Sequence, residues 1–297
     1  MTTATTILSG PARPLTGVLL AATATLMFAI ADVGMKHMMM LYAVPIVAAV
    51  RYVVSLTVLT AVMAPRHGRR LWHTQRTGLV VLRGFTLAGS SFTLGLALQV
   101  MPVGEAIAIM YLAPFIVMLL APRLLGERGR AVAWIGAVAG FTGVLIIARP
   151  GSGLAPFGVA MGFTTAALAA AYQLLSRELA RTETTAAMMF HSMLAGVVFF
   201  GPLALFTHRG PLPDLADLGF ITVLGLAALV GHSLLTAAYR DASASLLAPV
   251  NYLHLFWAGT LGWIAFGHVP DGWSMVGMVL VGGAGIAVAL HAHFGKA

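Results

Sequence analysis

Long runs of apolar residues, broken by proline, glycine and small groups of charged residues, follow one another along nearly the whole chain. A helix that crosses a bilayer needs about 20 mostly apolar residues in succession. Ten runs approach this length, so the pattern predicts ten transmembrane helices. They cover residues 15–37, 42–64, 78–99, 103–122, 131–148, 156–177, 186–206, 218–239, 244–266 and 273–291. Only Val100-Met101-Pro102 separates the third run from the fourth, so nine spans are the alternative. Pro102 followed by Gly104 is a typical helix stop and restart, which favours ten.

The composition points to the same class of protein. Of the 297 residues, 59% are hydrophobic and only 9% are charged, whereas about 25% are charged in an ordinary soluble domain. The mean hydropathy is +0.93. A soluble domain must cover its core with polar residues, so this excess of apolar surface has to face lipid. We therefore expect an all-α, polytopic membrane protein. The sequence contains no cysteine, which excludes disulfides and thiol chemistry.

The formal net charge of +8 could suggest a nucleic-acid-binding protein. Most of the arginines, however, lie in the short segments between the apolar runs. With a cytoplasmic N-terminus, twelve Lys and Arg residues face the cytoplasm and three face outward, while Arg51 and Arg83 lie within spans. The positive-inside rule then predicts that both termini are cytoplasmic, and no nucleic-acid partner is expected. Residues 1–14 and 292–297 become cytoplasmic tails, and the expected location is a bacterial-type cytoplasmic (inner) membrane.

A weak internal repeat relates the two halves of the chain. A shift of 141 positions brings identical residues together without a gap; the pairs are Tyr111 and Tyr252, Leu112 and Leu253, Phe115 and Phe256, Gly126 and Gly267, and Gly136 and Gly277. A chance match between apolar helices is the alternative. Each half holds five spans. Because five is odd, the second half enters the membrane in the opposite orientation to the first. We therefore predict two inverted five-helix repeats, 15–148 and 156–291, joined by a linker, 149–155. Inverted repeats place a binding site at their interface and permit alternating access.

The chain resembles the drug/metabolite transporter superfamily in its ten-helix EamA-type form. The residues that carry the resemblance are Leu112-Ala113-Pro114-Phe115, Leu125-Gly126-Glu127, Ile135-Gly136 to Gly143-Val144, Ala248-Pro249, Phe266-Gly267 and Val276-Gly277 to Gly285-Ile286. Members are typically exporters of amino acids and related metabolites, and the resemblance implies that class here. The family commonly repeats the Gly-Glu of the first half, whereas this chain has Gly267-His268.

Polar side chains at bilayer depth are costly, so each is a candidate for function. Asp32 suits a substrate amine or a coupling proton, with an i+4 ion pair to Lys36 as the alternative. Arg51 could bind a substrate carboxylate. Its alternatives are an ion pair with Asp32 or a side chain that snorkels to the membrane interface. We also expect Arg83 to snorkel. Glu105 lies in the first turn of its helix, where an acid suits the helix dipole, with outer gating or proton exchange as the alternative.

The ninth span carries the most informative group of polar residues. Asn251 and His254 share a face, and a rise of 1.5 Å per residue places His254 about 15 Å deep, near the midplane. An amide, an imidazole and aromatic rings at this depth suit an amino-acid-like ligand, although Asn251 could instead serve a kink after Pro249. The third, sixth and eighth spans each carry polar residues along one face, which predicts a water-filled cavity shared between the helices. The predicted substrate-binding residues are Phe28, Asp32, Ser90, Tyr111, Tyr172, His232, Asn251, Tyr252, His254 and Trp257. The proton-coupling candidates are Asp32, Glu105 and His254.

These observations favour a secondary transporter that exports amino acids, among them aromatic or other neutral ones, and related small metabolites by alternating access. A multidrug, nucleoside or cofactor carrier of the same fold, or a passive channel, is the alternative. No His-Glu-x-x-His, Gly-x-Ser-x-Gly or phosphate-loop motif occurs, so we expect neither an enzyme nor ATP use, and no ATPase subunit, metal or cofactor. The expected partners are a small-molecule substrate and the lipid bilayer, around a monomer.

Overall fold

Helices make up all the regular structure in the part of the chain that the computed structural model describes, which is residues 14–124, 131–149, 151–180, 182–207, 212–241, 247 and 250–294. The helices are α1 (Pro14–Leu41), α2 (Val44–His67), the short 3₁₀ helix η1 (Gly68–Leu71), α3 (Thr77–Val100), α4 (Val103–Met110), α5 (Ala113–Leu124), α6 (Ala131–Ile147), α7 (Pro156–Leu179), α8 (Thr185–Thr207), α9 (Leu215–Asp241), α11 (Leu253–Phe266) and α12 (Gly272–Phe294).

Within the described ranges, seven stretches are long and apolar enough to cross a membrane. The shorter apolar helices Trp134–Ile147, Leu253–Phe266 and Gly272–Val288 accompany them, as in a multi-pass membrane protein. Of the predicted tails, residues 1–13 and 295–297 lie outside the described residues, and α12 continues to Phe294. The motifs Leu125-Gly126-Glu127 and Ala248-Pro249 also lie outside them.

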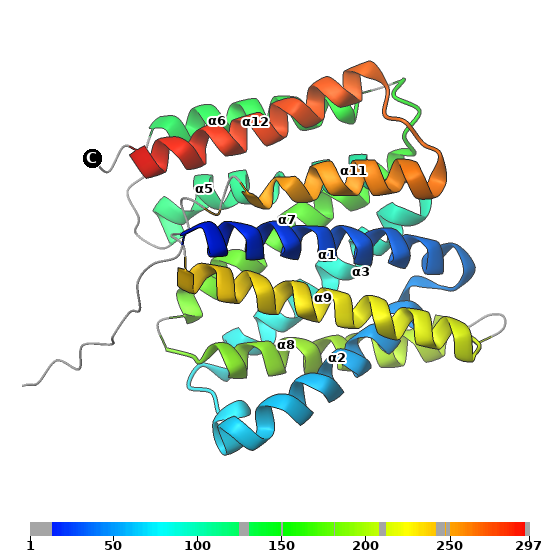
Figure 1. The fold of residues 1–297 in the computed structure, drawn as a ribbon, viewed down its shortest axis with the longest axis vertical. Coiled ribbons are helices and arrows are strands. Elements are labelled where there is room, and N and C mark those ends of the chain that lie inside the picture. The colour runs from blue at the N-terminus through cyan, green and yellow to red at the C-terminus, as the bar shows by residue number, and fades with distance from the viewer. Residues whose placement is uncertain are drawn as a thin grey trace, which may run out of the picture.

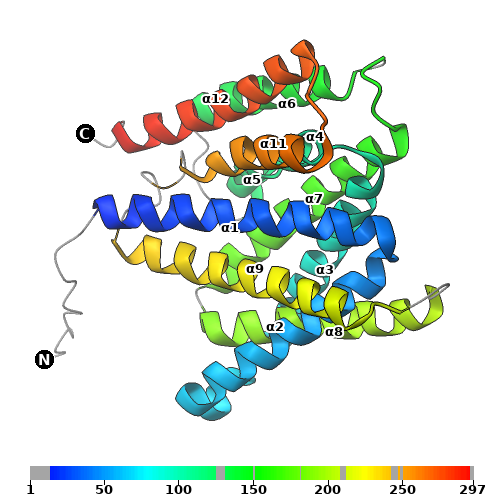
Figure 2. The same cartoon turned by 45° about the vertical axis from the view of Figure 1, so that its right-hand side comes forward.

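The helices form one bundle with their axes roughly aligned (Figure 1). We call the end at which α1 begins the proximal end, and the end at which α1 stops the distal end. Antiparallel α1 and α9 lie side by side in the middle of the view, with α6 and α12 at one edge and α2 and α8 toward the other. Figure 2 shows the same neighbours from a direction turned by 45°.

Each of the four most extensive helix contacts joins a helix from residues 15–148 to one from residues 156–291. These contacts are α1 with α9, α3 with α7, α6 with α12, and α2 with α8. The 141-residue shift matches α1 with α7, α2 with α8, α3 with α9, and α6 with α12. Exchanging matched helices therefore turns the contact of α1 with α9 into that of α7 with α3, and leaves the other two contacts unchanged. The bundle is therefore assembled across the halves rather than from two separate five-helix domains.

The centre of the bundle is α4. Seven of its eight residues are buried. The five apolar side chains among them, Val103, Ala106, Ile107, Ala108 and Ile109, belong to the largest apolar cluster, with residues of α3, α5, α6, α7, α11 and α12. The predicted span 103–122 is not one helix, because α4 stops at Met110 and α5 starts at Ala113. Pro114 has no N–H for the carbonyl of Met110 and so helps to end the i→i−4 pattern there. A second interruption lies at Tyr252, just before α11 begins at Leu253.

Candidate functional site

The two helix breaks meet inside the bundle. Tyr111, in the α4–α5 break, and Tyr252, in the break before α11, have ring centroids 5.1 Å apart. The Tyr111 hydroxyl donates a 2.7 Å hydrogen bond to the backbone carbonyl of Asn251. The Tyr252 ring lies so close to Gly285 of α12 that a Cβ there would overlap it. Broken helices expose backbone groups that a ligand or side chain can satisfy, and Tyr111 does so here.

An acid–imidazole pair lies beside these tyrosines. His254 Nε2 on α11 is 3.0 Å from Asp32 Oδ2 on α1, and the two side chains are only 8% and 20% exposed. The His254 ring also lies 6.0 Å from that of Tyr111. Among the described residues the ion pairs of Asp32 do not include Lys36 or Arg51, which were the alternative partners. The tertiary contact between α1 and α11 replaces the local helix pair.

Phe28 connects this pair to α9. Its ring centroid is 4.7 Å from that of His232 and 6.1 Å from that of His254. Phe28 can approach α9 closely because residue 231 is a glycine, at which a Cβ would meet the Phe28 ring. Arg51 and Asp32 both interact electrostatically with His232. We call the six residues Phe28, Asp32, Tyr111, His232, Tyr252 and His254 the central cluster.

A cavity of about 140 Å³ adjoins the central cluster at His232, between α2, α3, α8 and α9. Its polar lining includes Arg51, Tyr52 and Ser91. Ser91 Oγ accepts a 3.2 Å hydrogen bond from Arg51 Nη2 and lies 2.9 Å from the Tyr52 hydroxyl. Arg51 therefore faces a cavity whose remaining lining is mostly apolar.

This cavity is lined by Ser91, which the polar pattern of the sequence does not single out. Its predicted neighbour Ser90 has its Oγ 3.4 Å from the carbonyl of Thr165 on α7. Adjacent positions on a helix point about 100° apart, so Ser90 and Ser91 face different neighbours.

Three further predicted residues take other positions. Tyr172 belongs to a separate group around Arg83. Trp257 on α11 has a buried Nε1 without a hydrogen-bond partner among the described residues, and its ring packs against Phe256. Asn251 presents its backbone carbonyl to the central cluster.

The expectation that Arg83 snorkels toward the interface is wrong. Its side chain is buried, with its guanidinium 4.4 Å from the ring centroid of Tyr172. It donates four hydrogen bonds: to Ser176 Oγ (2.7 Å), the Met188 carbonyl (3.0 Å), Ser192 Oγ (2.7 Å) and the Tyr172 hydroxyl (2.7 Å). Arg83 thereby ties α3 to α7 and α8 near the proximal end.

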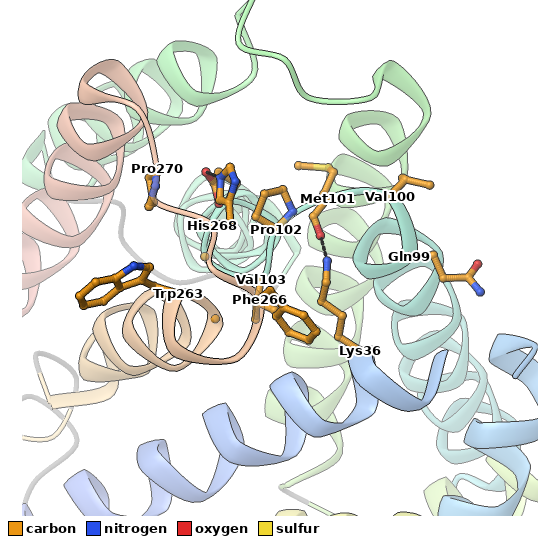
Figure 3. Close-up of a pocket in the computed structure, with 14 residues that line it drawn as sticks. Lys36, Gln99, Val100, Met101, Pro102, Val103, Trp263, Phe266, His268 and Pro270 are labelled. Carbon is orange, nitrogen blue, oxygen red and sulfur yellow. Dashed lines mark hydrogen bonds and ion pairs between the residues drawn. The ribbon is translucent and has the colours of Figure 1, made fainter. Parts of the chain in front are cut away.

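A second ionisable group lies at the distal end, around the cavity drawn in Figure 3. Glu105, in the first turn of α4 as expected, is 2% exposed. Its Oε1 is 3.0 Å from Nε2 of His268. Lys36 donates hydrogen bonds to the carbonyls of Leu98 and Met101 at the end of α3. These side chains line a cavity of about 250 Å³.

The distal loop between α11 and α12 is held by Asp271. Its carboxylate accepts the backbone N–H of Ser274 at 2.7 Å and a 2.7 Å hydrogen bond from Arg149. These two hydrogen bonds, the one from Ser274 first, hold the pKa of Asp271 below its usual value. Within the described ranges, no three His, Asp or Glu side chains are grouped as a metal site would need.

Comparison with known proteins assigns the chain to a family. The pattern of the EamA-like transporter family matches residues 15–149 and again residues 156–290, so the second match starts 156 − 15 = 141 residues after the first. A solved crystal structure of a protein aligns with 94% of this chain and 98% of its own, with a TM-score of 0.66 and 20% sequence identity. That likeness shows the fold.

Two curated relatives are transporters. A riboflavin transporter of Rhizobium johnstonii is 30% identical over 184 residues, 62% of this chain and 61% of the relative. A pseudopaline exporter of Pseudomonas aeruginosa is 29% identical over 196 residues, 65% of this chain and 68% of the relative. Because the family pattern occurs twice and together covers nearly the whole chain, the protein belongs to the EamA-like transporter family.

Proposed function

We propose that this protein is a secondary carrier that moves a small organic solute across a cytoplasmic membrane by alternating access. Its ten spans would form two inverted five-helix repeats with both termini in the cytoplasm. The helix pairing supports this arrangement, because α1 with α9 and α3 with α7 exchange when the halves are swapped. Inverted repeats with discontinuous helices at their interface are the common architecture of such carriers.

The observation that carries the proposal is the central cluster itself. Asp32 lies nine residues before the end of α1 and His254 twelve before the end of α11. At 1.5 Å per residue both are about 14–18 Å from the distal end, near mid-depth. Burying an acid–imidazole pair at that depth is costly, and ionisable groups within spans commonly mark a substrate or proton pathway. The aromatic rings of Phe28, Tyr111 and Tyr252 supply flat apolar surfaces beside it.

The solute we propose is a metabolite with a planar or aromatic part and polar or charged groups. Aromatic amino acids, moved outward, satisfy this description. A cofactor-like heterocycle is the second candidate, favoured by the relative named as a riboflavin transporter. Asp32 and His254 can exchange a proton between them, and we propose this pair, with Glu105 at the distal end, for proton coupling.

Counterflow in proteoliposomes tests the proposal. Vesicles loaded with unlabelled tryptophan or riboflavin should accumulate the labelled solute saturably, with and without a pH gradient. Accumulation by exchange requires a carrier, so its absence together with ohmic, non-saturating flux would indicate a channel. If neither solute exchanges, the proposed solute class is wrong.

The matched variants are Asp32→Asn, which weakens the pair with His254, and Asp271→Asn, which changes the same residue type in the distal loop. Removing a charge-assisted hydrogen bond costs about 1.5–3 kcal/mol, so Asp32→Asn should reduce the exchange rate about tenfold or more. Asp271→Asn should retain nearly full exchange, since Asn still caps a helix. Equal rates for both variants would remove Asp32 from the proposed site.

A further inference from the structure

The distal cavity is walled by groups that attract cations. It lies between the end of α1, the connection from α3 to α4, and the end of α11 (Figure 3). One wall is the carboxyl end of α3, where the last carbonyls have no partner within the helix and carry partial negative charge. A second wall is aromatic, with Phe266 and Trp263. A third is the carboxylate of Glu105.

A cation from the chain itself, the Lys36 ammonium, forms part of the wall of this cavity. The Lys36 ammonium donates a 2.8 Å hydrogen bond to the Leu98 carbonyl and a second to the Met101 carbonyl. It also lies 5.2 Å from the centroid of the Phe266 ring, within the range of a cation–π contact. Glu105 attracts it electrostatically. Lys36 belongs to α1, whereas the carbonyls it binds are at the end of α3 and the ring it contacts is on α11.

The wall of the cavity contains one hydrogen-bond acceptor without a donor. Glu105 is 2% exposed, and its Oε1 is taken by His268. Its Oε2 is buried without a hydrogen-bond partner among the described residues. A buried carboxylate oxygen without a donor is costly, and the missing group must be an N–H or O–H donor. An anion is disfavoured here, because two of the three Lys36 donors already serve carbonyls, His268 Nε2 already serves Glu105, and the Glu105 carboxylate would repel a negative charge.

We propose that the distal cavity is a binding site for a primary ammonium group, in which Lys36 stands in for the amino group of a carried solute. Carbonyls, an aromatic face and a carboxylate are the partners that an ammonium group uses. The solute's amino group takes up Glu105 Oε2 and replaces Lys36 as it passes the distal end. The reference to a carried solute rests on the proposed function, whereas ammonium binding does not.

Chemical rescue tests the site without any transport assay. Lys36→Ala removes the last three methylenes and the ammonium, a volume that n-propylammonium can refill. Lys36→Met keeps a long side chain but has no charge. We expect Lys36→Ala to unfold at a lower temperature than the wild type, and n-propylammonium chloride to restore its midpoint saturably. Potassium chloride and n-propanol at the same concentrations should not restore the midpoint of Lys36→Ala. The amine should not raise the midpoint of Lys36→Met.

If n-propylammonium fails to raise the midpoint of Lys36→Ala, or raises that of Lys36→Met equally, the cavity does not select ammonium and the proposal is wrong. If Lys36→Ala does not fold unaided, it is purified in the presence of the amine instead. Recovery of monodisperse protein with n-propylammonium but not with n-propanol supports the site, and recovery with neither overturns it.

The double variant Lys36→Ala with Glu105→Gln identifies the counter-ion. Glu105 attracts the ammonium at this position electrostatically, so losing its charge should raise the amine concentration for half-maximal rescue about tenfold. An unchanged concentration would exclude Glu105 from the site. A separate counterflow comparison of phenylalanine with 3-phenylpropionate, which lacks the amino group, tests the link to transport. Rescue without any counterflow contradicts the proposed function alone, whereas counterflow without rescue contradicts the ammonium site alone.

Discussion

Arg83 shows how a single residue can join the two halves of the bundle. It belongs to α3, yet its four hydrogen-bond acceptors lie on α7 and α8. The planar guanidinium presents donors in several directions at once, and the hydroxyls of Tyr172, Ser176 and Ser192 are placed to meet them. No acidic side chain forms an ion pair with Arg83 among the described residues. Neutral oxygens therefore stabilise this buried charge.

Arg83→Lys should destabilise the protein although it keeps the charge. A lysine ammonium has three donors at one point and cannot reach Ser176, Ser192 and Tyr172 together. Leaving buried partners unsatisfied predicts a loss of about 2–4 kcal/mol in the free energy of unfolding. The measurement is the thermal unfolding midpoint in detergent. Arg66→Lys, an exposed position at the end of α2, is the control and should change nothing. Equal midpoints for both variants would mean that the Arg83 hydrogen bonds add no stability.

At the scale of the elements, close helix packing depends on small residues. α6 and α12 approach so nearly that a Cβ on Gly277 would lie 2.6 Å from the Gly143 carbonyl oxygen and 2.6 Å from Ile147 Cγ1. Gly143 faces Gly277 in the same way from the other side. Small residues let helix backbones come close within a membrane, where dispersion rather than water exclusion drives helix association.

Gly277→Ala should therefore separate α6 from α12, at a cost of about 1–3 kcal/mol for overpacking. Gly283→Ala on the same helix is the matched control, since a Cβ there meets nothing within 4 Å. Because alanine favours helix more than glycine does, the control should be neutral or slightly stabilising. Unfolding midpoints of the two variants check this difference. A destabilisation of the same size at both positions would attribute the effect to α12 itself and not to its packing.

At the scale of the whole molecule, the bundle has two ends that are tied in different ways. The proximal end is joined by Arg83 and by the Arg76–Glu178 ion pair, with N–O 2.6 Å. The distal end is joined by Glu105 with His268 and by Lys36 with the end of α3. In a carrier that opens its two ends alternately, these ties would break in turn.

The orientation of the bundle can be tested because the chain has no cysteine of its own. Arg69→Cys places a thiol at the proximal end and Leu212→Cys places one near the distal end, both at exposed positions. If the arginine distribution orients the protein, an impermeant maleimide should label Leu212→Cys in intact cells. Arg69→Cys should react only after lysis. The reverse labelling would place the N-terminus outside and overturn the proposed orientation.

Much of the architecture follows from the sequence alone. Lipid imposes a length and a composition on every span, so apolar runs mark nearly all of the helices, and the 141-residue offset relates their two halves. The same reasoning selects Asp32, His254, Tyr111 and Tyr252, because polar groups stand out in an apolar helix. These signals are local, and a single helix is enough to display them.

Only the tertiary structure decides which of these residues meet. It pairs Asp32 with His254 rather than Lys36, presents Ser91 rather than Ser90 to the cavity, and interrupts the fourth span at Tyr111. Such contacts depend on the rotation and tilt of each helix about its axis. A helix that is apolar on all sides contains little information about rotation, since lipid and protein neighbours are equally apolar. Close contacts such as Gly277 against Gly143, between residues far apart in the chain, set that rotation.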